Sequence, residues 1–147
     1  MQTTKRKVLV TGGCGFIGSN LVNGFADLGH EVTVLDFGGK PFRNDVKFLN
    51  LNICDRDAVI KACAGMDTIV HNASIVHTKH NQEDVVWAVN HGGTLNIIEA
   101  CKAHKIPRLV YISSASAVYE GNDIANGDET LPYSTISQAP YADSKIQ

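Results

Sequence analysis

Short apolar runs rich in β-branched residues alternate with longer amphipathic stretches along most of this chain. Five runs have the length and composition of buried strands, and they cover residues 7–11, 31–36, 46–53, 67–73 and 108–114. Strands that are hydrophobic throughout are typical of parallel sheets, because helices cover such sheets on both faces. The pattern therefore predicts an α/β fold with a parallel sheet.

The stretches between the runs repeat their apolar residues with the period of an α-helix. Helices are expected over residues 16–29, 55–65 and 82–105. The first two end at Gly29 and Gly65, where a glycine C-cap is common. The expected core-facing stripe of the third helix consists of Val85, Val89, Ile97 and Cys101.

Two adjacent glycines, Gly92 and Gly93, interrupt the third expected helix just after Asn90. Each glycine costs a helix about 1 kcal/mol relative to alanine. Either a close packing contact with the sheet or a kink in the helix would explain them.

The alternation of strands and helices also predicts the topology. Right-handed crossovers through helices favour a doubly wound sheet of the Rossmann type, with the strand order 3-2-1-4-5. One domain over residues 1–147 fits the length. Residues 115–140 carry turn residues throughout and are expected to form a long active-site loop. We expect further strands and a substrate-binding lobe to lie beyond residue 147.

A last helix is expected from about Tyr141. About seven residues cannot hold a helix without packing, because helix nucleation is costly. We therefore expect this helix to fray unless it docks on the sheet or on a partner chain. We also consider a homodimer, because the fifth strand would be an open sheet edge.

The charge composition indicates which classes of binding partner to expect. With 13 Lys and Arg against 15 Asp and Glu and a net charge of −2, the chain has no long basic run that would favour nucleic acid or an anionic membrane. A small-molecule substrate is the better expectation. The apolar start breaks at Thr11, and no run approaches the roughly 18 apolar residues of a membrane helix. Membrane association through a segment beyond residue 147 stays open.

The cysteines and histidines do not predict a disulfide framework or a metal site. Cys14, Cys54, Cys63 and Cys101 have no C-x-x-C spacing, so we expect reduced thiols in a cytoplasmic protein. His77 and His80 have no third ligand spaced to join them, so no metal is expected.

A glycine-rich loop follows the first strand and leads into the first helix. The sequence TGGCGFIG spaces Gly12, Gly15 and Gly18 as G-x-x-G-x-x-G. Glycines let the backbone approach a pyrophosphate, while the helix N-terminus directs free N–H groups toward it. The alternative is a tight turn without a ligand. The context favours a dinucleotide site.

An acidic residue favours NAD as the dinucleotide. Asp36 ends the second strand about 20 residues after the glycine loop, where a carboxylate accepts hydrogen bonds from the adenosine ribose. A 2′-phosphate would meet repulsion there. Lys40 and Arg43 follow closely enough that NADP stays open.

A tyrosine and a lysine share one face of the last helix, because Tyr141 and Lys145 are four residues apart. A nearby ammonium stabilises a phenolate and so favours a tyrosine as a proton acceptor. A half-buried tyrosine beside a solvated lysine is the alternative. The upstream motifs favour the catalytic interpretation.

Six motifs in order resemble the extended short-chain dehydrogenase/reductase family over nearly the whole chain. They are TGGCGFIG, the acid of LDFGG, HNAS, VNHGGTLNIIEAC, YISSASAVYEG and YADSK. The loop SSASAVYEGNDIANGDETLPY resembles the 3β-hydroxysteroid dehydrogenase branch, and within it the decarboxylating sterol-4α-carboxylate 3-dehydrogenases. Nucleotide-sugar epimerases and dehydratases share the other five motifs.

The resemblance implies roles for individual residues. Tyr141 would transfer the proton, Lys145 would assist it and bind the nicotinamide ribose, and Ser114 would hold the substrate oxygen, with Ser116 as the alternative. The cofactor-binding residues it implies are Gly12, Gly15, Phe16, Ile17, Gly18, Asp36, Asn52, Ile53, Asn72, Ala73, Ser74 and Asn90, together with Tyr141 and Lys145. Asn52 stands where the family usually has an aspartate near the adenine, so we expect a weakened contact there.

The implied reaction is hydride transfer from a 3β-hydroxysteroid or a sterol-4-carboxylate to NAD or NADP. A nucleotide-sugar epimerase or dehydratase is the first alternative, and a non-catalytic NAD-binding module is the second. For residues 1–147 alone we expect folding and NAD binding with little turnover.

Overall fold

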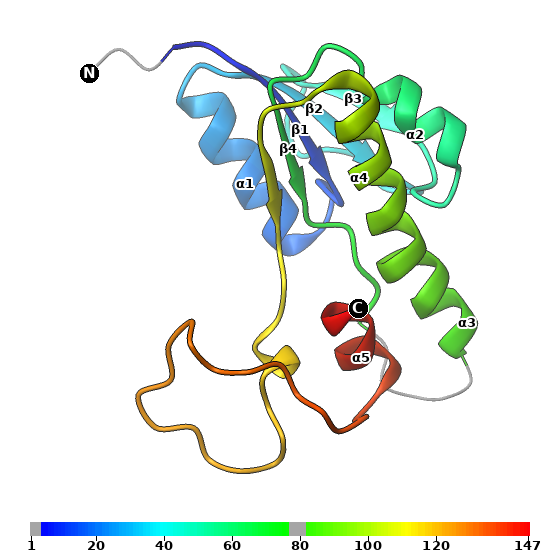
Figure 1. Ribbon diagram of the computed structural model, residues 1–147. Coiled ribbons are helices and arrows are strands. Elements are labelled where there is room, and N and C mark those ends of the chain that lie inside the picture. Colours follow the sequence, from blue (N-terminus) through cyan, green and yellow to red (C-terminus); the bar gives the residue numbers. More distant parts are fainter. Residues whose placement is uncertain (1–3, 77–81) are drawn as a thin grey trace.

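The computed structural model describes residues 4–76 and 82–147 and contains one parallel five-stranded sheet (Figure 1). The strands are β1 (Lys7–Thr11), β2 (Glu31–Asp36), β3 (Lys47–Asn50), β4 (Thr68–His71) and β5 (Leu109–Tyr111). Their order is β3-β2-β1-β4-β5, and every pairing is parallel. The predicted Rossmann-type sheet and its strand order are therefore confirmed.

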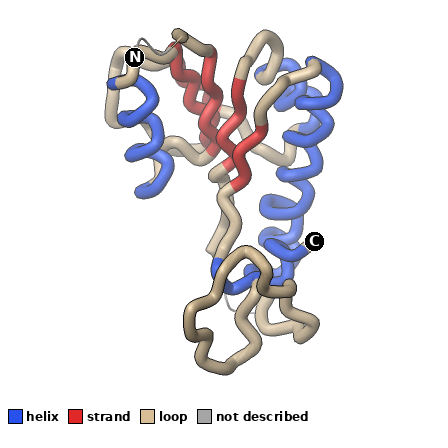
Figure 2. The backbone as a smooth tube through the Cα atoms, turned by 60° about the vertical axis from the view of Figure 1, so that its left-hand side comes forward, coloured by secondary structure: helices blue, strands red, loops and turns tan. Residues whose placement is uncertain are grey.

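Helices cover both faces of the sheet (Figures 1 and 2). The elements are α1 (Phe16–Asp27), α2 (Arg56–Ala62), α3 (Glu83–Val86), the π-helix η2 (Trp87–Gly92), α4 (Gly93–His104), the 3₁₀ turn η3 (Ala115–Ala117) and α5 (Pro140–Ile146). The segment α3–η2–α4 forms one continuous rod in Figure 1. Gly29 and Gly65 have positive φ angles of 84° and 74° shortly after α1 and α2, as glycine caps do.

The core divides into two layers because successive side chains of a strand point to opposite faces. On β1, Leu9 belongs to the cluster that contains Val59 of α2 and Ile97 of α4. Val10, the next residue, belongs to the cluster that contains Val22 of α1. The continuous apolar runs of the sequence therefore reflect a sheet that is buried on both sides.

The core-facing stripe predicted for the third helix is displaced by one residue at its start. Val85 is 48% exposed, whereas Val86 is fully buried. The buried positions continue through Asn90 and Gly93 to Ile97. A search for apolar periodicity misses this face, because an asparagine and a glycine occupy two of its positions.

The glycine pair now has a partial explanation. A Cβ atom on Gly93 would lie 2.9 Å from the side chain of Ile53, which follows β3, so a close packing contact requires glycine there. Gly92 meets only ordinary contact distances, but it ends the π-helical turn. Both a packing contact and an irregular helical turn are therefore present.

The strands are shorter than their apolar runs predicted, because the chain leaves the sheet at the carboxyl ends. The predicted strands over 46–53, 67–73 and 108–114 become 47–50, 68–71 and 109–111. The residues that follow each shortened strand lead into loops at the carboxyl ends of the strands. This is where ligands bind in open parallel sheets.

The terminal helix α5 docks instead of fraying. Its Ala142, Ser144 and Lys145 are buried, and Ser144 Oγ accepts a hydrogen bond of 3.0 Å from Asn90 Nδ2. Lys145 Nζ donates to the carbonyl oxygen of Ile112 at 3.0 Å. Packing against η2 and the segment after β5 thus supplies the stability that seven residues lack alone.

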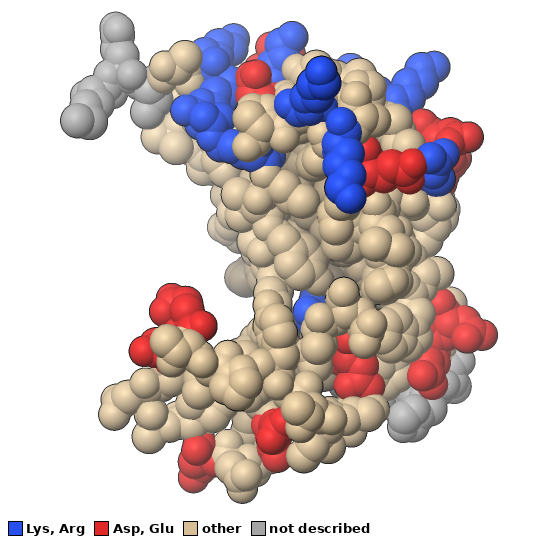
Figure 3. Space-filling model, in the orientation of Figure 1, with Lys and Arg blue, Asp and Glu red and all other residues tan. Residues whose placement is uncertain are grey.

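Lys and Arg side chains are unevenly distributed over the molecule. In Figure 3 they gather over the end where the strands begin, where some Asp and Glu side chains also lie, whereas mostly Asp and Glu side chains lie around the loop 115–139 and the helices near it. The net charge of −2 does not reveal this uneven distribution. Among the described residues, no helix has the length and apolar character needed to span a membrane.

Two glycines of α1 provide a test of the packing. A Cβ atom on Gly18 would lie 2.0 Å from the carbonyl oxygen of Gly12, whereas one on Gly24 would meet nothing within 4 Å. We expect Gly18→Ala to lower the free energy of unfolding by roughly 2 kcal/mol or more and Gly24→Ala to raise it by about 0.5 to 1 kcal/mol. Urea unfolding of both variants measures the difference. Equal effects of the two changes would contradict the close approach of α1 to the glycine loop.

Candidate active site

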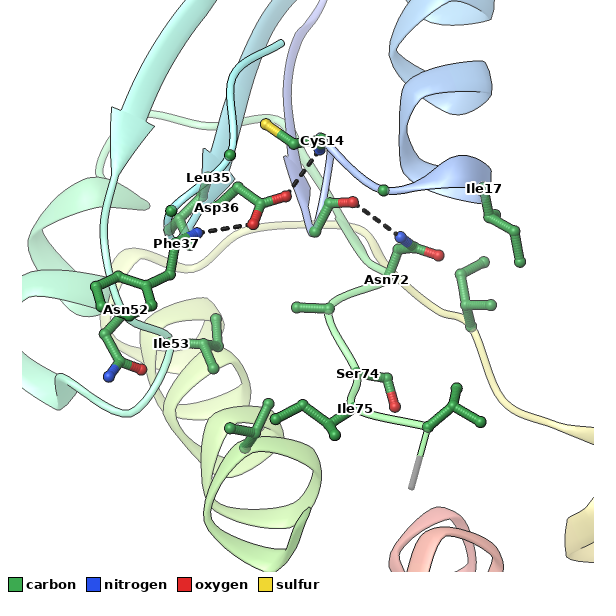
Figure 4. A pocket seen from close by; sticks show the side chains of 18 of the residues that line it. Cys14, Ile17, Leu35, Asp36, Phe37, Asn52, Ile53, Asn72, Ser74 and Ile75 are labelled. Carbon is green, nitrogen blue, oxygen red and sulfur yellow. Dashed lines mark hydrogen bonds between the residues drawn. The ribbon is translucent and has the colours of Figure 1, made fainter. Parts of the chain in front are cut away.

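A cavity of about 990 Å³ opens at the carboxyl ends of the strands (Figure 4). Its wall combines the glycine loop, the segments after β2, β3, β4 and β5, the rod formed by α3 and η2, and α5. This volume suits a cofactor-sized ligand. Of the residues predicted to bind a cofactor or to act in catalysis, the wall contains Gly12, Gly15, Phe16, Ile17, Asp36, Asn52, Ile53, Asn72, Ala73, Ser74, Tyr141 and Lys145.

The glycine loop brings backbone, not side chains, to the cavity. Gly12 has a φ of 66°, and a Cβ atom there would lie 2.8 Å from Ala73 Cα. Gly15 is the N-cap of α1, and no side chain caps the helix. The first amides of α1 are therefore left to bind an anion, with the helix dipole in support. Gly18 does not line the cavity, because it is packed under the loop against Gly12.

Asp36 is held by backbone amides, and no cation in the described ranges forms an ion pair with it. Its Oδ2 accepts a hydrogen bond from Cys14 N at 2.7 Å, and its Oδ1 accepts one from Phe37 N at 2.7 Å (Figure 4). The carboxylate keeps further lone pairs for a ligand in the cavity. Burial, followed by the charge of Asp36, raises the pKa of the Cys14 thiol to about 11, so the thiol is neutral.

The two cations near Asp36 in sequence are not on the cavity wall. Arg43 is bound to Asp27 at 2.5 Å and to Asp45 through two N–H groups. Lys40 does not line the cavity. The guanidinium of Arg43 is therefore engaged away from the position of a 2′-phosphate.

Asn52 and Ile53 line the cavity beyond Asp36. Asn52 Oδ1 accepts a hydrogen bond of 3.0 Å from Cys54 N, which orients the amide. Ile53 is 5% exposed and packs against Gly93, so α4 supports this part of the wall. This part of the wall thus offers one polar side chain, Asn52, and one apolar side chain, Ile53, to a ligand.

The segment after β4 has a buried hydroxyl that can bond to a ligand. Thr11 Oγ accepts hydrogen bonds from Asn72 N at 3.1 Å and from Ala73 N at 3.0 Å. Within residues 4–76 and 82–147, Ser74 Oγ is the only buried side-chain nitrogen or oxygen without a hydrogen-bond partner. Because Ser74 lines the cavity, its hydroxyl fits a polar group of a bound ligand. The residues present therefore fit a dinucleotide.

His71 at the end of β4 is buried and neutral. Its Nδ1 lies 2.8 Å from Thr11 Oγ, and its Nε2 lies 2.9 Å from Thr94 Oγ. Thr11 Oγ already accepts two amides, so its own hydrogen points to Nδ1, and Nε2 carries the proton of the ring. Burial, followed by the charge of Lys145, lowers the pKa of His71 to about 4.

Tyr141 and Lys145 both face the cavity from α5. The ammonium lies 5.9 Å from the centroid of the Tyr141 ring. Burial lowers the pKa of Lys145, and a hydrogen bond to the Ile112 carbonyl holds the group in place. The arrangement brings a phenol and a buried cation to the same wall.

Comparison with known proteins identifies the family to which this arrangement belongs. The sequence model of the 3-beta hydroxysteroid dehydrogenase/isomerase family matches residues 9–147. The chain belongs to this family. A 3-beta-hydroxysteroid dehydrogenase of Mycolicibacterium neoaurum is 37% identical over 154 residues, covering 99% of this chain and 42% of the relative. The human sterol-4-alpha-carboxylate 3-dehydrogenase, decarboxylating, is 35% identical over 145 residues, covering 99% and 39%.

Among solved structures, the UDP-glucose 4-epimerase of Thermus thermophilus in complex with NAD is similar to this chain. The TM-score is 0.83 at 35% sequence identity, covering 95% of this chain and 47% of the epimerase. The predicted resemblance to the extended short-chain dehydrogenase/reductases and their steroid dehydrogenase branch is confirmed. The chain spans less than half the length of each of these three proteins.

The serine expected to be catalytic in this family lies next to the wall. Ser113 lines the cavity, and Ser114 does not. Ser114 Oγ accepts hydrogen bonds from Ser116 N at 3.2 Å and from Ser116 Oγ at 2.8 Å. Its own hydrogen is left to donate. The catalytic role of Ser114 thus stays a prediction, and Ser116 holds the Ser114 hydroxyl through these two hydrogen bonds.

Asn90 was predicted to bind the cofactor, but its side chain forms hydrogen bonds to the segment after β4 and to α5. Its Oδ1 accepts from Ile75 N at 2.8 Å, and its Nδ2 donates to Ile75 O at 3.1 Å and to Ser144 Oγ at 3.0 Å. The side chain is 1% exposed and does not line the cavity. Both N–H groups of the amide are used within the fold, so the side chain positions α5 and the segment after β4.

Sequence reasoning missed much of the apolar wall. The unpredicted wall residues are Cys14, Leu35, Phe37, Gly38, Gly39, Leu51, Ile75, Val76, Val85, Val89, Ile112 and Ser113. The sequence signal that could have found most of them is adjacency to a strand end. His77 and His80, considered above for metal binding, lie outside the described residues.

The low pKa of His71 predicts acid sensitivity. The unfolded state binds a proton below about pH 6.5, whereas the folded state does so only near pH 4, so stability falls as the pH decreases through this interval. The free energy of unfolding should drop by about 2 kcal/mol between pH 6.5 and 4.5 from this group. Urea unfolding at several pH values measures it. His71→Gln should flatten this dependence, and the control His104→Gln should keep it; an unchanged slope in His71→Gln would refute the assignment.

Proposed function

We propose that the protein is an NAD-dependent dehydrogenase that oxidises the hydroxyl group of a 3β-hydroxysteroid or a sterol-4-carboxylate. The observation that carries the proposal is that Tyr141 and buried Lys145 share one cavity with the glycine loop and Asp36. Family membership supports it, since relatives carry the names 3-beta-hydroxysteroid dehydrogenase and sterol-4-alpha-carboxylate 3-dehydrogenase.

The bound nicotinamide would supply the hydride acceptor, and the chain would bind, orient and move the proton. The first amides of α1 would hold the pyrophosphate, Asp36 the adenosine ribose and Ser74 a further polar group of the cofactor. Tyr141 would take the hydroxyl proton of the substrate. A free tyrosine has a pKa near 10, and lowering it by about 2 to 3 units needs roughly 3 to 4 kcal/mol of phenolate stabilisation.

Lys145 would stabilise the phenolate and bind the cofactor, and Ser114 would orient the substrate. The ammonium keeps two N–H groups after its bond to the Ile112 carbonyl, and these can stabilise the phenolate and bind the nicotinamide ribose. The free hydrogen of Ser114 can be donated to the substrate oxygen. For a 4-carboxysterol, oxidation at carbon 3 yields a β-keto acid that loses carbon dioxide readily.

The character of the wall favours an apolar substrate. Ile75, Val76, Val85 and Val89 all line the cavity. Val76 is 72% exposed and Val85 is 48% exposed, so both offer apolar surface to a ligand. A sterol skeleton matches this surface. Epimerisation of a nucleotide sugar is the second candidate, because one of the similar solved structures is a UDP-glucose 4-epimerase.

Replacement of the phenol tests catalysis. In the protein that includes the substrate-binding lobe expected beyond residue 147, we expect Tyr141→Phe to lower turnover of a 3β-hydroxysteroid by roughly 100-fold or more, because a positioned proton acceptor contributes at least that much, while NAD still binds. NADH formation measures the first quantity, and calorimetric titration with NAD measures the second. The exposed Tyr119 provides the control Tyr119→Phe. An undiminished rate would refute the role of Tyr141, and turnover of a nucleotide sugar without any steroid turnover would favour the epimerase.

Cofactor preference provides a separate test. We propose NAD over NADP, because Asp36 faces the cavity while Arg43 is ion-paired away from it. Asp36→Asn should improve the ratio of NADP to NAD affinity by about tenfold or more, since a charged hydrogen bond is lost and a repulsion removed.

The control for cofactor preference is Arg43→Ala, which should leave both affinities near the wild-type values. Titration with each dinucleotide measures them. Selective loss of NADP binding in Arg43→Ala would show that the guanidinium leaves Asp27 and Asp45 to bind the phosphate, and would overturn the preference.

A further inference from the structure

The ammonium of Lys145 is buried against aromatic rings, and no carboxylate among the described residues forms an ion pair with it. Lys145 is 7% exposed, and its Nζ lies 4.8 Å from the centroid of the Tyr111 ring. The four ion pairs found in the described part of the chain involve only Arg43 and Arg56 as cations. Burial lowers the pKa of Lys145, and the face of an aromatic ring can offset part of this effect because it favours the charged form.

We propose that Tyr111 is a positioning residue whose ring face keeps the Lys145 ammonium charged and fixed beside Tyr141. An aromatic face attracts a cation within about 6 Å of its centroid, and more strongly where water is excluded. Tyr111 lies at 4.8 Å, closer to the ammonium than the Tyr141 ring at 5.9 Å. The inference rests on the proposed function, because Lys145 affects the reaction only through Tyr141 and the cofactor.

The Tyr111 ring is itself held in place. It stacks on His71, with a centroid distance of 5.7 Å and an interplanar angle of 29°, and the two residues are register partners on β4 and β5. His71 is fixed in turn, because its Nδ1 lies 2.8 Å from Thr11 Oγ and its Nε2 lies 2.9 Å from Thr94 Oγ. The Tyr111 ring therefore cannot turn away from the ammonium without losing its stacking on a ring that is itself held in place.

The surroundings keep the contact electrostatically favourable. Neutral His71 does not compete as a second cation for the ring. Burial raises the pKa of Tyr111, so its own phenol stays neutral. The other titratable groups around Lys145 are Tyr141 on α5, His91 on η2 and Tyr133 in the long loop, the last two across a smaller cavity that Lys145 also lines.

The test is the titration of Lys145, followed by nuclear magnetic resonance of the lysine Cε and Nζ atoms in protein without cofactor or substrate. The signal is assigned by its loss in Lys145→Gln. We expect Tyr111→Leu, which keeps an apolar side chain but removes the ring face, to lower the pH at which Lys145 titrates, and Tyr111→Phe to leave it near wild type. Because no turnover is needed, this result is independent of the identity of the substrate.

Fluorinated phenylalanines at position 111 guard against misfolding of Tyr111→Leu. Successive fluorines weaken the negative ring face at nearly constant volume, so the titration of Lys145 should move to lower pH stepwise. Val110→Ala, the neighbouring strand position with a 47% exposed side chain, is the control for disturbance of β5. No response to fluorination would overturn the proposal. Equal effects of Tyr111→Phe and Tyr111→Leu would also overturn it, because the hydroxyl group would then be responsible.

The pH profile of turnover supplies a second readout. Tyr111→Leu should lower the rate near pH 7 by roughly 5- to 30-fold and move the ascending limb of the profile to higher pH, since Tyr141 would lose part of its cationic support. A merely structural role would lower the rate at every pH without moving the limb, and that outcome would refute the proposal. If no steroid is turned over while the Lys145 titration behaves as expected, the proposed substrate is wrong and the role of Tyr111 stands.

Discussion

The close approach of the glycine loop to the end of β4 is the constraint on which the rest of the site depends. Gly12 has no room for a Cβ atom beside the backbone of Ala73. Thr11 Oγ closes the same gap by accepting the amides of Asn72 and Ala73. Because β1 and β4 are parallel neighbours, this contact sets the start of α1 and the wall after β4 together. A ligand therefore meets backbone on both sides at the narrowest point of the loop.

The same tie extends to the helix that carries the predicted catalytic pair. Thr11 bonds to His71, His71 to Thr94, and Thr94 to the backbone of Asn90. The side chain of Asn90 then bonds to Ser144 on α5. A chain of hydrogen bonds thus joins the cofactor cradle to the proton-transfer residues, and such chains resist the displacement of any single member. This link explains how a helix of seven residues keeps its place.

The fold could be predicted from sequence because its determinants are local. Continuous apolar runs mark strands buried on both faces, and the glycine spacing with Asp36 marks the first crossover and the cofactor. The sequence predicted less well which single residues are buried in the third helix and which ones line the cavity. Asn90 occupies a buried helical position that periodicity reserves for apolar side chains, while Val85 lines the cavity. Motif reading likewise favours Ser114 over Ser116, whereas the serine that lines the wall is Ser113. Neither periodicity nor a motif gives the direction of a single side chain.

Charged side chains have different kinds of partner inside the cavity and on the surface. Arg43 and Arg56 are saturated by carboxylates. Asp36 and Lys145 instead meet neutral groups, namely two backbone amides for the carboxylate and a carbonyl with a ring face for the ammonium. A salt bridge within the cavity would have neutralised both charges and removed them from any ligand. Neutral partners offset part of the desolvation cost while leaving lone pairs on Asp36 and N–H groups on Lys145. The cavity therefore keeps both charges available for the hydroxyl groups of a dinucleotide and for the proton transfer proposed at Tyr141.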